Sequence, residues 1–399
     1  MSKRKSTAIY DWNKNQLYKL LYGLYHTKVP TMIWGNPGGG KTSTVNFIGK
    51  NLNVPTVIRS GNKSDPVDFS GVPYLIDCAN TEGGKALRYS EPKYVQIMKE
   101  SPNGILFFDE ITTCSPVIQV ALLSIIQDCQ FGEFEIPKSI YRVAAGNYNN
   151  ITGTHNMSLA LMNRFCHIFY DMNMEFFLDG FISGWQNYEN CKINNSNDQI
   201  DKNLNYRLAV TNFLKQHPDL LNSFPADGAV SDPHEFAYPT PRSWEMIVKI
   251  LSVLDGNEGE YIQELVKGCI GETTGNFFLK FLEDHKGLEI EIPSFVGKED
   301  KFRLPYPDRH DHVYQIMASM VYYLEQDPKK YMELWIHVIN VLHNEDNKYG
   351  NYASYDGLIM KYLFSNIKLL LDTGILLPSD IKDFSKKIPC YNLLGLIGG

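Results

Sequence analysis

The stretch Gly35-Asn36-Pro37-Gly38-Gly39-Gly40-Lys41-Thr42 constrains the fold of this chain more than any other. It follows a short apolar run, residues 31–34, and it fits the pattern G-x-x-x-x-G-K-[ST] of a phosphate-binding loop. Glycines leave backbone N–H groups free to converge on a polyphosphate, and the helix expected at 43–50 presents its positive N-terminus to the same anion. The alternative is a glycine-rich surface turn that contains a lysine by chance.

In such a loop the lysine reaches the terminal phosphates and the following hydroxyl reaches Mg²⁺. We therefore expect Lys41 to contact phosphate and Thr42 to be a Mg²⁺ ligand. The predicted nucleotide-binding residues are Gly35, Asn36, Pro37, Gly38, Gly39, Gly40, Lys41, Thr42 and Ser43.

A second motif, an apolar strand followed by two acidic residues, supports the assignment of a phosphate-binding loop. Residues 105–110 read Ile-Leu-Phe-Phe-Asp-Glu, an apolar strand that ends in two carboxylates. Such a strand places Asp109 at the carboxyl edge of a sheet, where it can hold a Mg²⁺-bound water, while Glu110 can polarise the water that attacks the γ-phosphate. A strand that runs into an acidic turn is common and is weak evidence alone. It becomes strong evidence 68 residues after Lys41, within an α/β pattern.

The α/β pattern covers the first 172 residues. Short apolar strands are expected at 31–34, 55–59, 105–108, 142–145 and 167–170, and helical stretches alternate with them. This alternation is typical of a mostly parallel sheet. An additional N-terminal helix is indicated by Leu17, Leu20, Leu21 and Leu24, which recur at helical spacing.

After residue 172 the strand signal fades. Residues 186–205 are rich in Asn and predict an exposed loop. Beyond them the apolar spacing is helical, with one stripe at Val313, Met317, Met320 and Leu324 and another at Leu334, Val338 and Val341. Both stripes are interpreted as packed cores.

The 399 residues are too many for one compact core, so two or three domains are expected. We predict an α/β nucleotide-binding domain at 1–172, a helical lid at 173–278 and a mainly helical C-terminal extension at 279–399.

Charge and composition limit the partners. The net charge of −7 argues against a general duplex-binding surface, which would carry a basic excess. The seven cysteines follow no pairing rhythm, no signal peptide is visible, and no run approaches the roughly 18 apolar residues that span a bilayer. We expect a cytoplasmic protein that does not bind membranes.

The nucleotide base is indicated only weakly. Residues 62–65 read Asn-Lys-Ser-Asp, which matches the N-K-x-D sequence that binds guanine in many GTPases. In those proteins the motif follows the Mg²⁺-binding Asp, whereas here it precedes Asp109. We interpret the match as a coincidence, and ATP is the expected nucleotide.

With these residues in place, the chain resembles the AAA+ ATPases, and among them the MoxR-like branch, over residues 30–170 and near residue 240. The resemblance implies a sensor-1 role for Asn147, at the end of the run YRVAAGN. It implies that Arg164 in LALMNRF is an arginine finger for a neighbouring subunit, and that Arg242 in YPTPRSWEM is sensor 2 on a helical lid. Alternatively, Arg164 is a helix-capping surface charge and Arg242 is a structural ion-pair partner.

The resemblance also implies an insertion in helix 2 at 65–95, with a hairpin turn at Gly83-Gly84. In relatives such hairpins face the pore of a ring. Tyr74, Tyr89 and Tyr94 are then candidates for gripping a client.

The resemblance therefore implies a Mg²⁺-dependent ATPase that assembles into a homo-oligomeric ring, with hexamers as the family expectation, and that remodels a protein client. A von Willebrand A domain protein is implied as a partner by the same resemblance. The alternative function is a nucleic-acid motor, such as a helicase or a McrB-type translocase of restriction systems. A third hypothesis, an ATP-gated scaffold, is disfavoured because every hydrolytic element is present.

Overall fold

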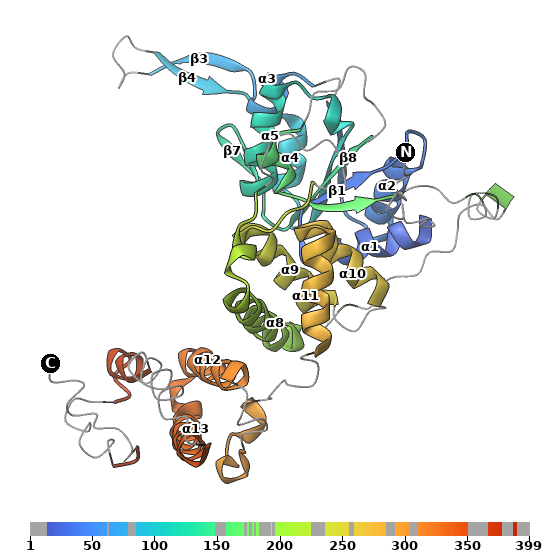
Figure 1. Ribbon diagram of the computed structural model, residues 1–399. Coiled ribbons are helices and arrows are strands. Elements are labelled where there is room, and N and C mark those ends of the chain that lie inside the picture. The colour runs from blue at the N-terminus through green and yellow to red at the C-terminus, as the bar shows by residue number, and fades with distance from the viewer. Residues whose placement is uncertain are drawn as a thin grey trace. The chain divides into compact units, whose positions relative to one another are not determined.

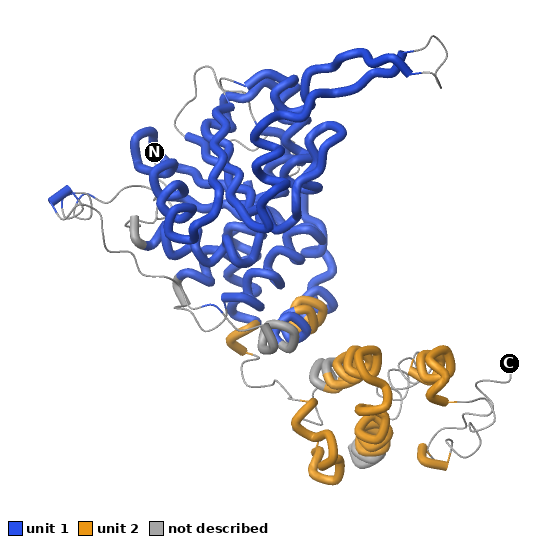
Figure 2. Tube along the Cα trace, turned by 180° about the vertical axis from the view of Figure 1, so that it is seen from behind, with its two compact units in different colours: residues 1–206, 213–281 blue, residues 207–212, 282–399 orange. Residues whose placement is uncertain are grey.

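The computed structural model describes residues 14–61, 64–78, 85–147, 157–170, 196–224, 236–254, 259–284, 292–303, 310–349, 366–376 and 386–388, with isolated positions at 174, 178, 181, 182 and 193. Figure 1 shows the order of the elements along the chain. The chain divides into two compact units, which Figure 2 colours separately. Unit 1 contains residues 1–206 and 213–281, and unit 2 contains residues 207–212 and 282–399. The predicted boundary at residue 172 falls inside unit 1.

The centre of unit 1 is a sheet of five parallel strands. They are β1 (Thr31–Trp34), β2 (Thr56–Ser60), β5 (Gly104–Asp109), β8 (Ile140–Gly146) and β9 (Cys166–Phe169). Their order is β2-β5-β8-β1-β9, and every neighbouring pair is parallel. The predicted α/β core is therefore confirmed. Because the strands are parallel, all of their carboxyl ends lie at one edge of the sheet.

Helices surround this sheet, and along the chain they alternate with its strands. They are α1 (Lys14–Thr27), α2 (Lys41–Asn51), α3 (Pro66–Ser70), α4 (Lys93–Lys99), α5 (Pro116–Asp128) and α6 (Leu159–Met162). The leucine stripe of α1 is buried, as its spacing predicts. Proline begins α5, where its missing N–H costs nothing, and the helix ends at Cys129 in the left-handed conformation.

Residues 65–95 contain an antiparallel hairpin of β3 (Pro73–Asp77) and β4 (Lys85–Tyr89). The predicted turn at Gly83-Gly84 lies outside the described residues. A second short hairpin pairs β6 (Gln130–Phe131) with β7 (Phe134–Glu135).

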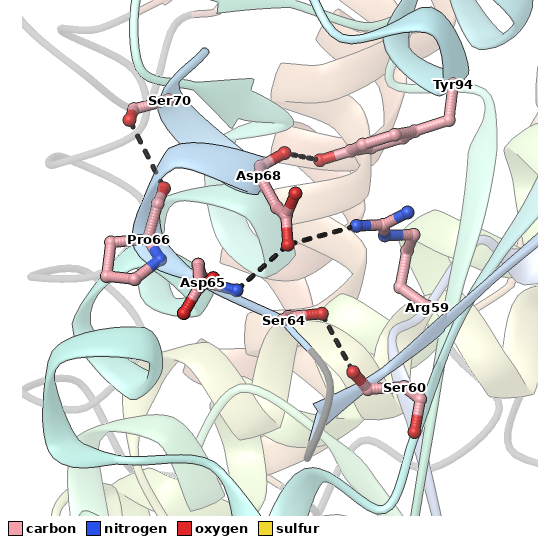
Figure 3. A network of polar contacts seen from close by, with 8 residues as sticks. All are labelled: Arg59, Ser60, Ser64, Asp65, Pro66, Asp68, Ser70 and Tyr94. Atoms are coloured by element: carbon pink, nitrogen blue, oxygen red, sulfur yellow. Dashed lines mark hydrogen bonds and ion pairs between the residues drawn. The ribbon is translucent and has the colours of Figure 1, made fainter. Parts of the chain in front are cut away.

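Polar contacts join the helices that flank the β3–β4 hairpin to strand β2 (Figure 3). Asp68 on α3 accepts a hydrogen bond from the backbone N–H of Asp65 at 2.9 Å and forms an ion pair with Arg59 on β2 at 3.4 Å. The Tyr94 hydroxyl on α4 donates to the Asp68 carbonyl at 2.6 Å, and its ring lies under the Arg59 guanidinium. The base of the hairpin is thus fixed to the sheet.

The helices that follow the sheet are α8 (Ser196–Gln216), α9 (Pro241–Leu254), α10 (Gly259–Ile270) and α11 (Glu272–Asp284). They belong to unit 1 except for residues 207–212 of α8 and 282–284 of α11. The prediction of an exposed loop over 186–205 is wrong for residues 196–205, which form the first part of α8. Asn203 donates to Ser252 on α9 at 3.2 Å, and Leu204 is buried. Tertiary contacts here override the weak helix propensity of the Asn-rich segment.

Unit 2 is mainly helical and is built around α12 (His310–Gln326) and α13 (Pro328–Tyr349). The α12 stripe and Leu334 and Val338 of α13 are fully buried, and Val341 packs against them partly buried. Both stripes are core, as predicted. Across the described residues, none of the helices combines the length and apolar character that crossing a bilayer requires.

Candidate nucleotide site

The glycine-rich loop lies between the end of β1 and the start of α2. Gly38 and Gly40 have φ values of 79° and 82°, a region that side chains rarely adopt. A Cβ on Gly35 would stand 2.2 Å from the Tyr170 carbonyl oxygen. Steric and backbone requirements therefore explain these glycines. Gly40 caps α2 in the left-handed conformation, and the N-terminus of a helix directs its first backbone N–H groups toward an anion.

Lys41 connects this loop to a second strand end. Its Nζ donates to the Gly35 carbonyl at 2.7 Å, the Asn36 carbonyl at 2.9 Å and Asn147 Oδ1 at 3.1 Å. Asn147 directly follows β8, so the predicted sensor 1 and the predicted phosphate lysine are in contact although 106 residues separate them. Lys41 is buried, which holds its ammonium group in one place.

The two predicted Mg²⁺ ligands are also neighbours. Thr42 Oγ1 donates to Asp109 Oδ2 at 2.6 Å. Among the described residues no group of three or more His, Cys, Asp or Glu side chains could hold a metal ion. A hydroxyl and one carboxylate nevertheless fit Mg²⁺, which keeps several waters and takes its remaining ligands from substrate phosphates. The residues present therefore fit a Mg²⁺–nucleotide.

Glu110, the residue after Asp109, has an unusual backbone conformation. Its φ is 56° and its ψ is 39°, the left-handed region, which is costly for a residue with a side chain. The Glu110 carbonyl accepts hydrogen bonds from the Thr113 N–H at 3.0 Å and the Thr113 hydroxyl at 2.7 Å. A Cβ on Gly61 would lie 2.8 Å from the Glu110 carbonyl oxygen. The sequence alone did not identify Thr113 or Gly61 as neighbours of Glu110. The only available signal was that Gly61 is a glycine directly after a strand.

The two predicted arginines lie together. Arg242 contacts Asn163, the residue directly before Arg164, and burial and the charge of Arg242 lower the pKa of Arg164. Arg164 donates to the Ala160 carbonyl in α6. Arg242 donates to Asn163 Oδ1 at 3.2 Å and to Gln127 Oε1 at 3.0 Å.

Arg164 lies at the edge of the sheet opposite the phosphate loop. Arg164 comes just before Cys166, which is in register with Thr31 at the amino end of β1. The loop follows Trp34 at the carboxyl end of the same strand. The structure thus brings Lys41, Thr42, Asp109 and Asn147 together, and it brings Arg164 and Arg242 together, as two separate groups. Sequence reasoning missed Gln127 and Asn163, because no motif marks them.

The two groups are linked through a buried histidine. Trp34, the last residue of β1, donates from Nε1 to His167 Nδ1 at 2.9 Å, and His167 Nε2 contacts the Met162 carbonyl at 2.9 Å. Burial lowers the pKa of His167 to about 4, so the ring is neutral and Nε2 is the donor. Met162 is two residues before Arg164.

The parallel sheet, its glycine loop and the adjoining Thr–Asp pair define a P-loop nucleotide-binding core. Residues 30–165 match the family model of the AAA domain (dynein-related subfamily). Residues 30–165 are therefore similar to an AAA domain, a kind of domain that implies nucleotide binding. The comparison with curated proteins gives no match.

Among solved structures, a crystal structure described as a candidate ATPase from Cytophaga hutchinsonii is similar to this chain. The sequences are 15% identical, the match covers 68% of this chain and 89% of the other, and the TM-score is 0.41.

Proposed function

We propose that this protein is a Mg²⁺-dependent AAA+ ATPase of the MoxR-like branch that hydrolyses ATP in a homo-oligomeric ring, a hexamer, and remodels a protein client. The observation that carries the catalytic part is the convergence of Lys41, Thr42, Asp109 and Asn147, which come from three separated segments, at the carboxyl edge of the sheet.

Each residue has a role that fits its position. The backbone N–H groups at the start of α2 and the Lys41 ammonium bind the phosphates. Thr42 and Asp109 would hold Mg²⁺, which would supply charge neutralisation for the phosphates. Asn147 orients the γ-phosphate and the attacking water, and Glu110 accepts the proton of that water.

The ring part of the proposal rests on the arginine pair. Arg164 is attached at the edge of the sheet opposite the phosphate loop, so we assign it to the site of a neighbouring copy. An arginine finger contributes a factor of roughly 10³–10⁵ in rate, or about 4–7 kcal/mol. An isolated copy would then bind ATP and hydrolyse it slowly.

The client part rests on the β3–β4 hairpin, which we assign as the helix-2 insertion. Leu75 and Leu87 face each other across its strands with 64% and 53% of their surfaces exposed. Such an apolar pair suits contact with an extended protein segment. A von Willebrand A domain partner and a cytoplasmic location belong to the same proposal.

Turnover as a function of protein concentration tests the ring. Specific activity should rise as copies assemble, and mixtures of Arg164→Ala with Lys41→Ala should regain activity that neither variant has alone. Absence of rescue, with assembly verified by size, would contradict action between copies. Salt-dependent stimulation of ATP hydrolysis by DNA or RNA would indicate that the client is a nucleic acid and not a protein.

A further inference from the structure

The arginine pair is held by neutral oxygens. Arg242 Nη1 and Nη2 donate to the amide oxygens of Asn163 and Gln127, at 3.2 and 3.0 Å. Arg164 donates to a backbone carbonyl of α6. Across the part of the chain that the structure describes, no carboxylate forms an ion pair with either arginine, although the charge of Asp128 acts on Arg164 and offsets part of the effect of burial and of Arg242 on its pKa.

Neutral acceptors have a specific consequence. An amide oxygen fixes the direction of an N–H bond but leaves the guanidinium charge uncompensated, whereas a carboxylate would cancel it. Gln127 is in the last turn of α5, and the negative end of this helix favours a cation beside it. Two like charges are therefore kept close together and remain available to an anion.

We propose that Gln127 is a positioning residue that aims Arg242 without neutralising it, so that Arg164 and Arg242 together face the polyphosphate bound by a second copy of the chain. This inference rests on the proposed function, because it needs a nucleotide site in a neighbouring copy. It assigns a role to a residue that lies far from the phosphate loop along the chain.

Gln127 is the better probe of the two amides. Asn163 is buried, accepts a hydrogen bond from Thr240 at 2.9 Å and donates to the Tyr238 carbonyl, so its replacement disturbs several contacts. Gln127 is exposed, and the only side-chain hydrogen bond that the structure describes for it is with Arg242. Variants at this position are expected to fold.

The test compares Gln127→Glu with Gln127→Met. The Glu variant preserves the hydrogen bond and adds a charge that cancels that of Arg242, so kcat should fall about tenfold. The Met variant removes the hydrogen bond but leaves the charge, so kcat should fall only about two- to fivefold. The affinity for an ATP analogue should be unchanged in both. A purely structural role predicts the opposite order, with Met worse than Glu.

Mixing experiments locate the defect. Gln127→Glu copies have intact phosphate loops, and Glu110→Gln copies have intact arginine pairs, so mixed rings should recover turnover. Gln96→Glu adds the same charge on an exposed position of α4 and should behave as wild type. Wild-type kcat in Gln127→Glu, a lower kcat in Gln127→Met than in Gln127→Glu, or a loss without rescue would overturn the inference. Concentration-independent turnover by the wild type would instead overturn the proposed ring.

Discussion

Thr42 Oγ1 donates a hydrogen bond of 2.6 Å to Asp109 Oδ2, which joins the first turn of α2 to the last residue of β5. Two segments 67 residues apart thus place a hydroxyl and a carboxylate side by side. The first prediction concerns the role of this pair in binding Mg²⁺.

Asp109→Asn should abolish the gain in ATP affinity that Mg²⁺ provides and leave affinity in EDTA nearly unchanged, because the amide is a poor ligand for a hard cation. Titration of a fluorescent ATP analogue with and without Mg²⁺ measures this difference. Asp77→Asn, an exposed carboxylate on β3, is the control for loss of one charge. An undiminished Mg²⁺ effect in Asp109→Asn would show that this carboxylate does not hold the ion.

Glu110→Gln should retain ATP binding and lose turnover by a factor of roughly 10²–10⁴, because the amide cannot accept a proton from the attacking water. Binding of a labelled analogue and release of phosphate are measured on the same preparation. Glu100→Gln, at an exposed position after α4, controls for the loss of one carboxylate. Normal phosphate release in Glu110→Gln would remove Glu110 from the proton-accepting role.

The sequence predicts those features of the site that are determined by neighbouring residues along the chain. The triple glycine is predicted because Gly38 and Gly40 adopt backbone angles that only glycine takes readily. The strands are predicted within one or two residues, and four of them, β1, β5, β8 and β9, are mainly apolar because a parallel sheet is buried on both faces.

Contacts between distant segments are not predicted in the same way. The Gln127–Arg242 hydrogen bond spans 115 residues and depends on how α5 packs near α9, which no short pattern encodes. The first turns of α8 were missed because Asn and Asp favour loops locally, whereas contacts with α9 determine the outcome.

His167 provides a pH dependence with a defined sign. Its pKa in the folded protein, about 4, is below the ordinary value of about 6.5, so the unfolded chain binds a proton more readily than the folded chain. The stabilising contribution is complete above pH 6.5 and is lost as the pH falls towards 4, by about 3 kcal/mol in total. His167→Gln keeps both hydrogen bonds without a titrating group. The free-energy difference between wild type and variant, from urea unfolding at several pH values, should change over this window. Parallel pH profiles would contradict the prediction.

Tyr94 and Tyr74 give a matched pair of substitutions near the β3–β4 hairpin. The Tyr94 hydroxyl donates to the Asp68 carbonyl at 2.6 Å (Figure 3). Its ring packs against Phe131, and burial raises the pKa of the hydroxyl. Tyr94 therefore fixes the base of the hairpin, and its hydroxyl is hydrogen-bonded within the fold. Tyr74 is 48% exposed on β3.

Tyr94→Phe should lower the free energy of unfolding by about 1–2 kcal/mol, because the Asp68 carbonyl loses its donor in a partly buried place. Tyr74→Phe makes the same chemical change on an exposed side chain and should alter it by less than about 0.5 kcal/mol. Urea unfolding of the two variants under one set of conditions makes the comparison. Equal losses would mean that the hydroxyl of Tyr94 contributes no more than a solvent-exposed one, and the hairpin base would then be held by the Arg59–Asp68 ion pair and ring packing alone.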